Sequence, residues 1–210
     1  MNAPTRELKA VLPTVAGGWK CILADPPWRF NTWNKTEVVA ARGYGSASAS
    51  IHYRTMPLAD IKALPVADVC ATDCTLFIWT CWPMLLESLA LIEAWGFKFK
   101  TCGFFWTKAH AGQIEMFRDD MDALMGQGYW TRSNSEPCLL ATRGHPKRLN
   151  ADVRQGIIEP RREHSRKPDC VHERIERLVG GPYIELFARQ SRPGWTSWGN
   201  ETTKFDGAAA

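Results

Sequence analysis

Residues 22–30, ILADPPWRF, constrain the fold more than any other stretch of the chain. Residues 20–25, KCILAD, predict a buried strand because their centre is a continuous apolar run. That strand must stop at Pro26 and Pro27, because proline lacks the N–H group that a central strand donates. Asp25 stands at the stop. The stretch therefore predicts a buried strand whose carboxyl end presents a carboxylate on a stiff turn.

The remaining hydrophobic pattern indicates an α/β fold. Continuous apolar runs predict further strands, at residues 75–80, 97–108, 137–144, 156–160 and 183–189. Amphipathic patterns predict helices over residues 82–97 and 167–181, each with a proline near its start and a glycine near its end. Continuous apolar strands between helices indicate a sheet covered on both faces. Ligands of such sheets bind beyond the carboxyl ends of the strands, so we expect Asp25 and Arg189 to face one crevice.

Length and composition fit one globular domain. The chain has 210 residues, 45% of them hydrophobic and 23% charged, which is ordinary for a soluble protein. No apolar run is long enough for a membrane helix, and residues 1–18 lack a signal-peptide core, so we expect a cytoplasmic protein without membrane contact. Residues 1–18 are expected to be loosely ordered, residues 31–50 to form a mobile loop, and residues 202–210 to be a disordered tail.

Cysteine and histidine do not indicate a metal centre. The seven cysteines include no Cys-x-x-Cys pair, and the five histidines are scattered. We therefore interpret the cysteines as structural thiols and expect no zinc site.

Basic residues are concentrated in one segment. The net charge is +4, but residues 143–167 hold eight basic and three acidic residues, so this segment is +5 and the rest of the chain is −1. Such a segment suits a polyanion, although most charged runs are only solvated loops. Within it we select Arg143, Lys147 and Arg148 as candidate substrate contacts.

The motif Asp25-Pro26-Pro27-Trp28 suits an exocyclic amine on a flat base. The lone pair of such an amine is delocalised into the ring, and acceptors for its two protons would favour a pyramidal, nucleophilic nitrogen. Asp25 supplies one acceptor. The carbonyl between the prolines supplies a second, held in place by fixed φ angles. Trp28 offers a face for base stacking, although a Pro-Pro turn with a core tryptophan explains the same letters without chemistry.

The same residues resemble a known family. DPPW is typical of amino-group methyltransferases that use S-adenosylmethionine, and an acid in its first position is typical of adenine-specific members. Further blocks occur in family order: HYRTM (52–56), LFIWT (76–80), WGF (95–97), SEPCLLATRG (135–144), EPRREHSRKPD (159–169), IERL (175–178), IELFAR (184–189) and WGNE (198–201). Over about residues 20–201 the chain resembles the MT-A family, named after the seventy-kilodalton subunit of the messenger-RNA N6-adenosine methyltransferase.

The resemblance implies a permuted, β-class Rossmann-like domain over residues 19–201, with a mostly parallel sheet and S-adenosylmethionine as cofactor. It implies catalytic roles for Asp25, Pro26, Pro27 and Trp28. It implies cofactor contacts by Asp25, Lys167, Phe187, Arg189, Asn200 and Glu201. It places Tyr53 in a first active-site loop, and His164 and Ser165 in a second.

The sequence leaves the substrate open. Cys170 stands where the family usually has an acid, which removes one supporting carboxylate. No zinc-finger pattern precedes residue 19, as in short phage and bacterial members, so we expect N6-adenine methylation of DNA more than of RNA. A catalytically inactive nucleic-acid-binding subunit is a further alternative, which the intact motif argues against. A homodimer or a partner subunit remains open.

Overall fold

A mixed seven-stranded sheet organises the computed structural model, which describes residues 11–28, 55–109, 130–131, 133–163 and 166–207. Along the sheet the strands lie in the order β5-β3-β4-β2-β1-β6-β7. Their bounds are β1 (Trp19–Ala24), β2 (Cys70–Trp79), β3 (Lys98–Ala109), β4 (Ser135–Arg143), β5 (Gly156–Pro160), β6 (Tyr183–Leu186) and β7 (Trp195–Trp198). The predicted α/β class is confirmed.

Strand directions bring distant parts of the chain to one edge of the sheet. β1 runs parallel to β2 and β6, β6 parallel to β7, and β3 parallel to β5. β4 is antiparallel to both neighbours, β2 and β3. The sheet is therefore mostly parallel, as expected. Because Ala24 pairs with Leu186, β1 and β6 end side by side.

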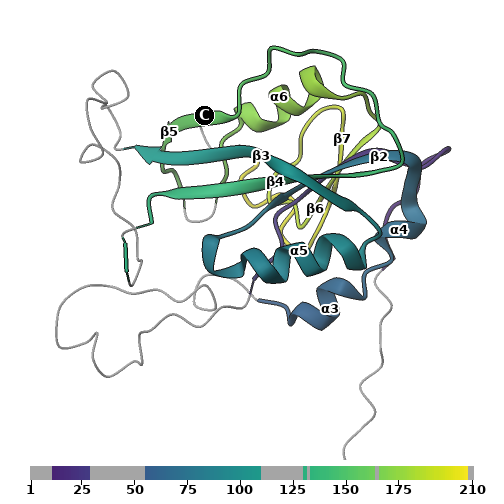
Figure 1. The fold of residues 1–210 in the computed structure, drawn as a ribbon, viewed down its shortest axis with the longest axis horizontal. Helices are drawn as coiled ribbons and strands as arrows, with labels where there is room; N and C mark the ends of the chain where they lie inside the picture. The colour runs from purple at the N-terminus through teal and green to yellow at the C-terminus, as the bar shows by residue number, and fades with distance from the viewer. Residues whose placement is uncertain (1–10, 29–54, 110–129, 132, 164–165, 208–210) are drawn as a thin grey trace, which may run out of the picture.

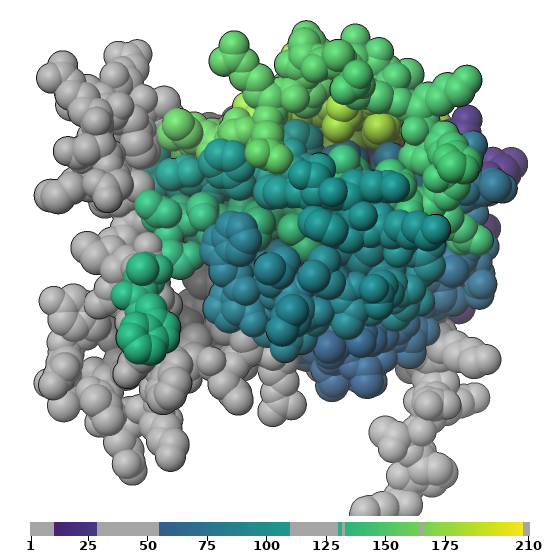
Figure 2. All heavy atoms as spheres, viewed as in Figure 1, coloured from purple at the N-terminus to yellow at the C-terminus, as the bar shows by residue number. Residues whose placement is uncertain are grey.

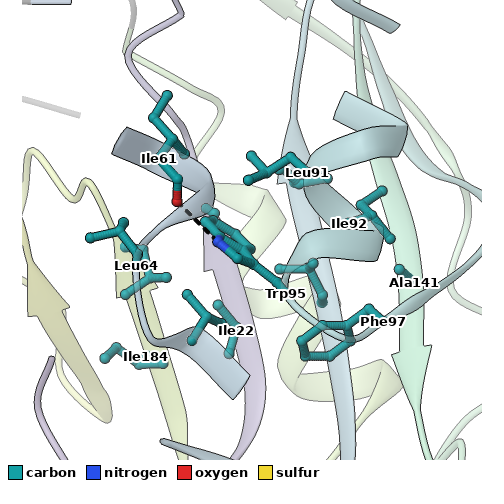
Figure 3. Packing of buried hydrophobic residues seen from close by; sticks show 14 of the residues in the cluster. Ile22, Ile61, Leu64, Leu91, Ile92, Trp95, Phe97, Ala141 and Ile184 are labelled. Atoms are coloured by element: carbon teal, nitrogen blue, oxygen red, sulfur yellow. Dashed lines mark hydrogen bonds between the residues drawn. The ribbon is translucent and has the colours of Figure 1, made fainter. Parts of the chain in front are cut away.

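Helices cover both faces of the sheet (Figure 1). One face carries α3 (Leu58–Lys62), α4 (Val66–Val69) and α5 (Leu85–Ala94), which follows the 3-10 turn η1 (Trp82–Met84). The opposite face carries α6 (Cys170–Leu178). Figure 3 shows the first of these layers, where the buried indole Nε1 of Trp95 donates to Ile61 O at 3.1 Å. No helix among the described residues is long and apolar enough to cross a membrane.

Both ends of the described chain are better packed than the sequence suggested. Leu12 is buried, and the indole N–H of Trp19 reaches back to Pro13 O at 2.8 Å, so residues 11–18 are part of the fold. At the other end Phe205 is buried, and its N–H donates to Arg189 O at 3.0 Å. The expected loop at residues 31–50 lies outside the described residues.

Candidate active site

The candidate site lies where β1 and β6 end. Asp25 follows β1 directly, and its N–H donates to Leu186 O at 3.2 Å. A pocket opens beside it, hereafter the Asp25 pocket, lined by Asp25, Arg166, Lys167, Asp169, His172, Glu185, Phe187, Arg189, Gln190, Arg192 and Phe205. The expectation that Asp25 and Arg189 face one crevice is confirmed.

Lys167 is the centre of the charged contacts in this pocket. Its Nζ lies 3.0 Å from Asp25 Oδ2 and 3.4 Å from Glu136 Oε2. The same Nζ lies 5.6 Å from the centre of the Trp79 ring, within the range of a cation–π contact. Glu136 also pairs with Lys108. Lys167, from the segment before α6, thus contacts Asp25, which follows β1, and Glu136, which lies at the start of β4.

The electrostatics keep Lys167 and Glu136 ionised. Burial by itself lowers the pKa of Lys167, but the Asp25 and Glu136 carboxylates outweigh it, and the pKa lies above its ordinary value. Burial would raise the pKa of Glu136, but Lys167 and Lys108 outweigh it, and the pKa falls to about 2. At neutral pH Lys167 is therefore a cation and Glu136 an anion.

The two prolines form a turn whose carbonyls are already engaged. Trp28 N–H donates to Pro26 O at 2.8 Å, and Met56 N–H donates to Pro27 O at 3.0 Å. The sequence predicted the Pro26 carbonyl as a second acceptor for the amine. Because a carbonyl oxygen has two lone pairs, Pro26 O can still accept one further proton. The turn is thus held from outside as well as by proline.

Trp28 is a core residue, which corrects the expectation of an open stacking face. Only 5% of its surface is exposed, and its indole Nε1 donates to Trp79 O at 3.1 Å. The side chain packs in the cluster on the α5 side of the sheet. It therefore anchors the end of the DPPW turn, and its ring has no free face for a base.

A second turn follows β6. Phe187 has φ of +63°, a conformation rare for a bulky residue and usual for glycine. Ala188 N–H then donates to Trp198 O at 3.0 Å. A Cβ on Gly199 would stand 3.0 Å from Ala188 O, so another residue there would push the two segments apart by a few tenths of an ångström. Phe187 lines the Asp25 pocket.

The remaining predicted cofactor residues lie beside that turn. Arg189 Nε is 3.8 Å from Glu201 Oε2, which also contacts Lys204 at 3.0 Å. Asn200 is exposed, and neither it nor Glu201 lines the pocket. The structure therefore brings Asp25, Lys167, Phe187 and Arg189 together, with the other two at the margin.

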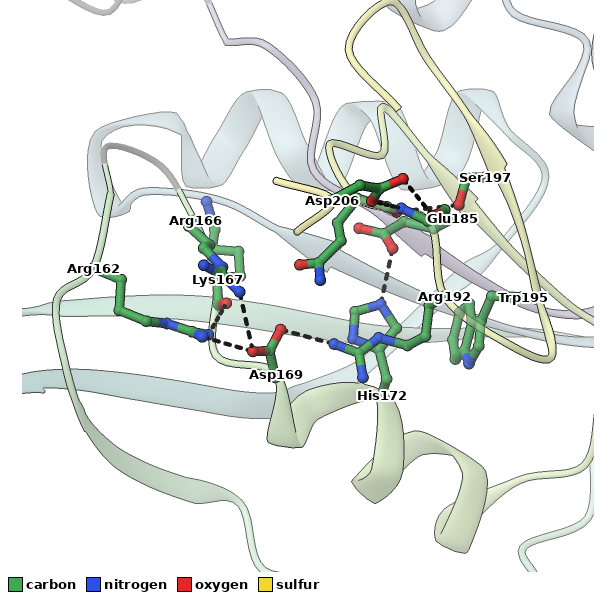
Figure 4. Close-up of polar contacts among 12 residues, drawn as sticks. Arg162, Arg166, Lys167, Asp169, His172, Glu185, Arg192, Trp195, Ser197 and Asp206 are labelled. Carbon is green, nitrogen blue, oxygen red and sulfur yellow. Dashed lines mark hydrogen bonds and ion pairs between the residues drawn. The ribbon is translucent and has the colours of Figure 1, made fainter. Parts of the chain in front are cut away.

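Asp169 forms ion pairs with arginines from two separate segments of the chain (Figure 4). Its carboxylate accepts from Arg162 at 2.6 Å and from Arg192 at 2.7 Å, and lies 3.6 Å from Arg166. These contacts fix the segment before α6 against the segment after β6. Burial raises the pKa of Asp169, but Arg162 and the other arginines lower it further, so the net shift is downward.

The candidate substrate contacts Arg143, Lys147 and Arg148 lie far from this pocket. Arg143 pairs with Cys74 in the sheet, five residues before the end of β2, or about 16 Å from the edge where Asp25 lies. Its guanidinium donates to Ala67 O. Leu149 N–H donates to Leu178 O at the end of α6, and the segment passes around that helix (Figures 1 and 2). The basic segment 143–167 therefore does not gather as a whole around Asp25, and contact of these three residues with nucleic acid stays a prediction.

Three predicted residues lie outside the described part of the chain: Tyr53, His164 and Ser165. Several residues of the site were not selected from sequence, and among them Glu136 contacts Lys167 directly. Its signal was an acid at the start of a predicted strand, in SEPCLLATRG. Only the antiparallel pairing of β4 with β2 brings that start to the edge where Asp25 lies.

Comparison with known proteins supports one family. The MT-A70 family model matches residues 19–201. The chain is 32% identical to the type II methyltransferase M.MunI of Mycoplasma, over 95% of this chain and 85% of that protein. It is 26% identical to an MT-A70-like N(6)-adenosine-methyltransferase of Arabidopsis thaliana, over 93% of this chain but 25% of that protein. With the mouse N(6)-adenine-specific methyltransferase METTL4 it shares 27% identity, over 88% of this chain and 37% of that protein. The chain belongs to the MT-A70 family.

Proposed function

We propose that this protein transfers a methyl group from S-adenosylmethionine to the 6-amino group of adenine in DNA. The single observation that carries the proposal is the Asp25 pocket, in which the first residue of the DPPW turn meets Lys167 at 3.0 Å. Membership of the MT-A70 family and the names of the relatives, which include adenosine-specific and adenine-specific methyltransferases, support the reaction.

The charges around the pocket suit the methionine end of the cofactor, which carries a carboxylate and an ammonium group. Lys167 Nζ has three protons, and two carboxylates lie within reach of it. A third proton would be available to the methionine carboxylate. Asp25 would take the ammonium group, and Phe187 and Arg189 would line the ribose side. When bound, the cofactor supplies an activated methyl group on a sulfonium.

The pocket must widen to admit such a ligand. Its volume is about 40 Å³, about three times the smallest space that holds one water molecule. Arg166 and Phe205 stand in its wall, and the Arg166 guanidinium lies 5.5 Å from the centre of the Phe205 ring. We therefore infer that the buried Phe205 and its segment shift when the cofactor enters.

The chemistry falls to Asp25 and Pro26. Asp25 Oδ and the remaining lone pair of Pro26 O would accept the two protons of the 6-amino group. This would localise the lone pair of the nitrogen and make it the nucleophile for the methyl group that the cofactor would supply, with the cofactor sulfur as leaving group. One N–H proton leaves the methylated nitrogen, and Asp25 is placed to receive it. In duplex DNA the adenine must first be flipped out of the stack.

The similarity covers 85% of the bacterial type II methyltransferase but only 25–37% of the plant and animal relatives, which favours DNA over RNA. RNA is the second candidate, because several relatives are named as N(6)-adenosine-methyltransferases.

Labelled S-adenosylmethionine distinguishes these substrates. The purified protein is incubated with duplex DNA, single-stranded DNA and RNA of mixed sequence, and each polymer is digested to nucleosides. Label in N6-methyldeoxyadenosine supports the proposal, and label only in N6-methyladenosine from RNA supports the second candidate. Label in a cytosine product, or in none of the polymers, would refute adenine methylation.

A further inference from the structure

Trp82 is an exposed aromatic residue beside the candidate active site. It begins η1, directly after β2, and 48% of its surface is exposed. Six other tryptophans are buried in the two core clusters: Trp19, Trp28, Trp79, Trp95, Trp106 and Trp195. An indole offers a large apolar surface that a protein ordinarily buries. Leu86, four residues further on, is 77% exposed.

The position of Trp82 is linked to the charged network of the site. Its indole Nε1 donates to Ser135 Oγ at 3.2 Å. Ser135 begins β4, and the next residue is Glu136, whose carboxylate lies 3.4 Å from Lys167 Nζ. Lys167 in turn contacts Asp25. The indole is therefore oriented by the same end of β4 that contributes to the Asp25 pocket.

The two neighbours on β4 place Trp82 outside that pocket. Successive side chains of a strand point to opposite faces of the sheet, so Ser135 and Glu136 face opposite ways. Glu136 faces Lys167, and Ser135 faces the side that carries α5. An adenine held at Asp25 would not reach the indole across β4. The next nucleotide of the same strand would lie over this edge.

We propose that Trp82 is the platform on which the base next to the target adenine stacks. The proposal rests on the proposed function and deepens it, because it assigns a nucleobase to a specific exposed surface. Trp28, the aromatic residue of the DPPW motif, is buried and cannot take this role. Stacking on an indole accepts any base, so Trp82 contributes affinity for a flipped or single-stranded segment without selecting its sequence.

Trp82→Ala tests the platform in steady-state methylation of single-stranded and duplex oligonucleotides. Loss of base stacking should raise the KM for the oligonucleotide roughly ten- to hundredfold. The kcat and the affinity for S-adenosylhomocysteine should stay within about twofold, since the indole does not line the cofactor pocket. Trp82→Phe should keep most of the affinity. Ser135→Ala, which only frees the indole to turn, should have a smaller effect than Trp82→Ala.

Phe99→Ala is the matched control. Phe99 is 46% exposed, close to the 48% of Trp82. It pairs with Ala141 near the opposite edge of the sheet, away from Asp25. Its removal should therefore leave the KM unchanged. Thermal unfolding of all variants checks that the fold is intact.

Abasic substitutions identify the stacked base. Oligonucleotides that lack one base at each position within three nucleotides of the methylated adenine are compared with the intact strand. With the wild-type protein, one adjacent abasic site should raise KM as much as Trp82→Ala does. With Trp82→Ala the same abasic site should cause no further increase.

Two outcomes would overturn the platform. One is a KM for folded Trp82→Ala within twofold of the wild-type value. The other is an additive effect of the variant and every abasic site, which would mean that the indole touches no base. Both presuppose a wild-type protein that methylates adenine. Absence of methylation by the wild-type protein would instead refute the proposed function.

Discussion

Lys167 Nζ lies 3.0 Å from Asp25 Oδ2, although 142 positions separate the two residues in the sequence. Asp25 is placed by the end of β1, and Lys167 by the segment that leads into α6. Their contact therefore depends on two distant elements meeting at the carboxyl edge of one sheet. In the mechanism that we propose, Lys167 would hold the carboxylate of the cofactor, and Asp25 would face both the ammonium group of the cofactor and the 6-amino group of adenine.

Lys167→Ala should weaken binding of S-adenosylhomocysteine more than binding of nucleic acid. A hydrogen bond to a charged group contributes about 1.5–3 kcal/mol, so the affinity should fall roughly ten- to hundredfold. Titration calorimetry measures it directly. Lys108→Ala is the control, because Lys108 also pairs with Glu136 but does not line the pocket. If the cofactor affinity is unchanged and DNA binding is lost, Lys167 contacts a phosphate of the nucleic acid and not the cofactor.

Glu136→Gln should destabilise the protein at neutral pH. The folded-state pKa of Glu136 is lowered to about 2, below the value of about 4.3 in an unfolded chain. This stabilisation is complete above about pH 4.3 and is lost as the pH falls through 2. It is on the order of 3 kcal/mol. Denaturant unfolding at several pH values should show a difference from wild type that shrinks below pH 4.3. A difference that does not change down to pH 2.5 would contradict the ion pairs.

Arg161→Ala should reduce the salt dependence of DNA binding more than the double variant Lys147→Ala, Arg148→Ala. Arg161 follows the end of β5, at the edge where β3 and β4 approach the site. One lost phosphate contact should flatten the slope of log affinity against log salt by about 0.9 on a duplex, or about 0.7 on a single strand. The prediction is wrong if Arg161→Ala keeps the wild-type slope and the double variant has a flatter one. The nucleic acid would then bind near Lys147 and Arg148, away from Asp25.

The sequence predicted the strands and helices that have a distinctive hydrophobic pattern. Continuous apolar runs located β1, β2 and β6, and amphipathic spacing located α5 and α6. β7 was missed because WTSW is short and its two central residues are polar. α3 and α4 were missed because five and four residues are too few for a periodic pattern.

The sequence predicted site residues only where a short local motif indicates their chemical function. Asp25 between a strand and two prolines was such a case. Residue type could not show that Trp28 is buried while Trp82 is exposed, because both are large aromatics that follow a buried strand. Nor could it show that Glu136 reaches Lys167 and Arg143 does not, since both depend on the register of β4 with β2.

Asp25→Ala provides the most direct measurement of the central claim. The rate of methyl transfer to duplex DNA is measured at saturating S-adenosylmethionine, with circular dichroism to confirm the fold. Losing an acceptor that acts in the transition state should cost several kcal/mol, so the rate should fall by about a thousandfold or more. A folded Asp25→Ala variant that keeps its rate within about tenfold of wild type would contradict the role of Asp25.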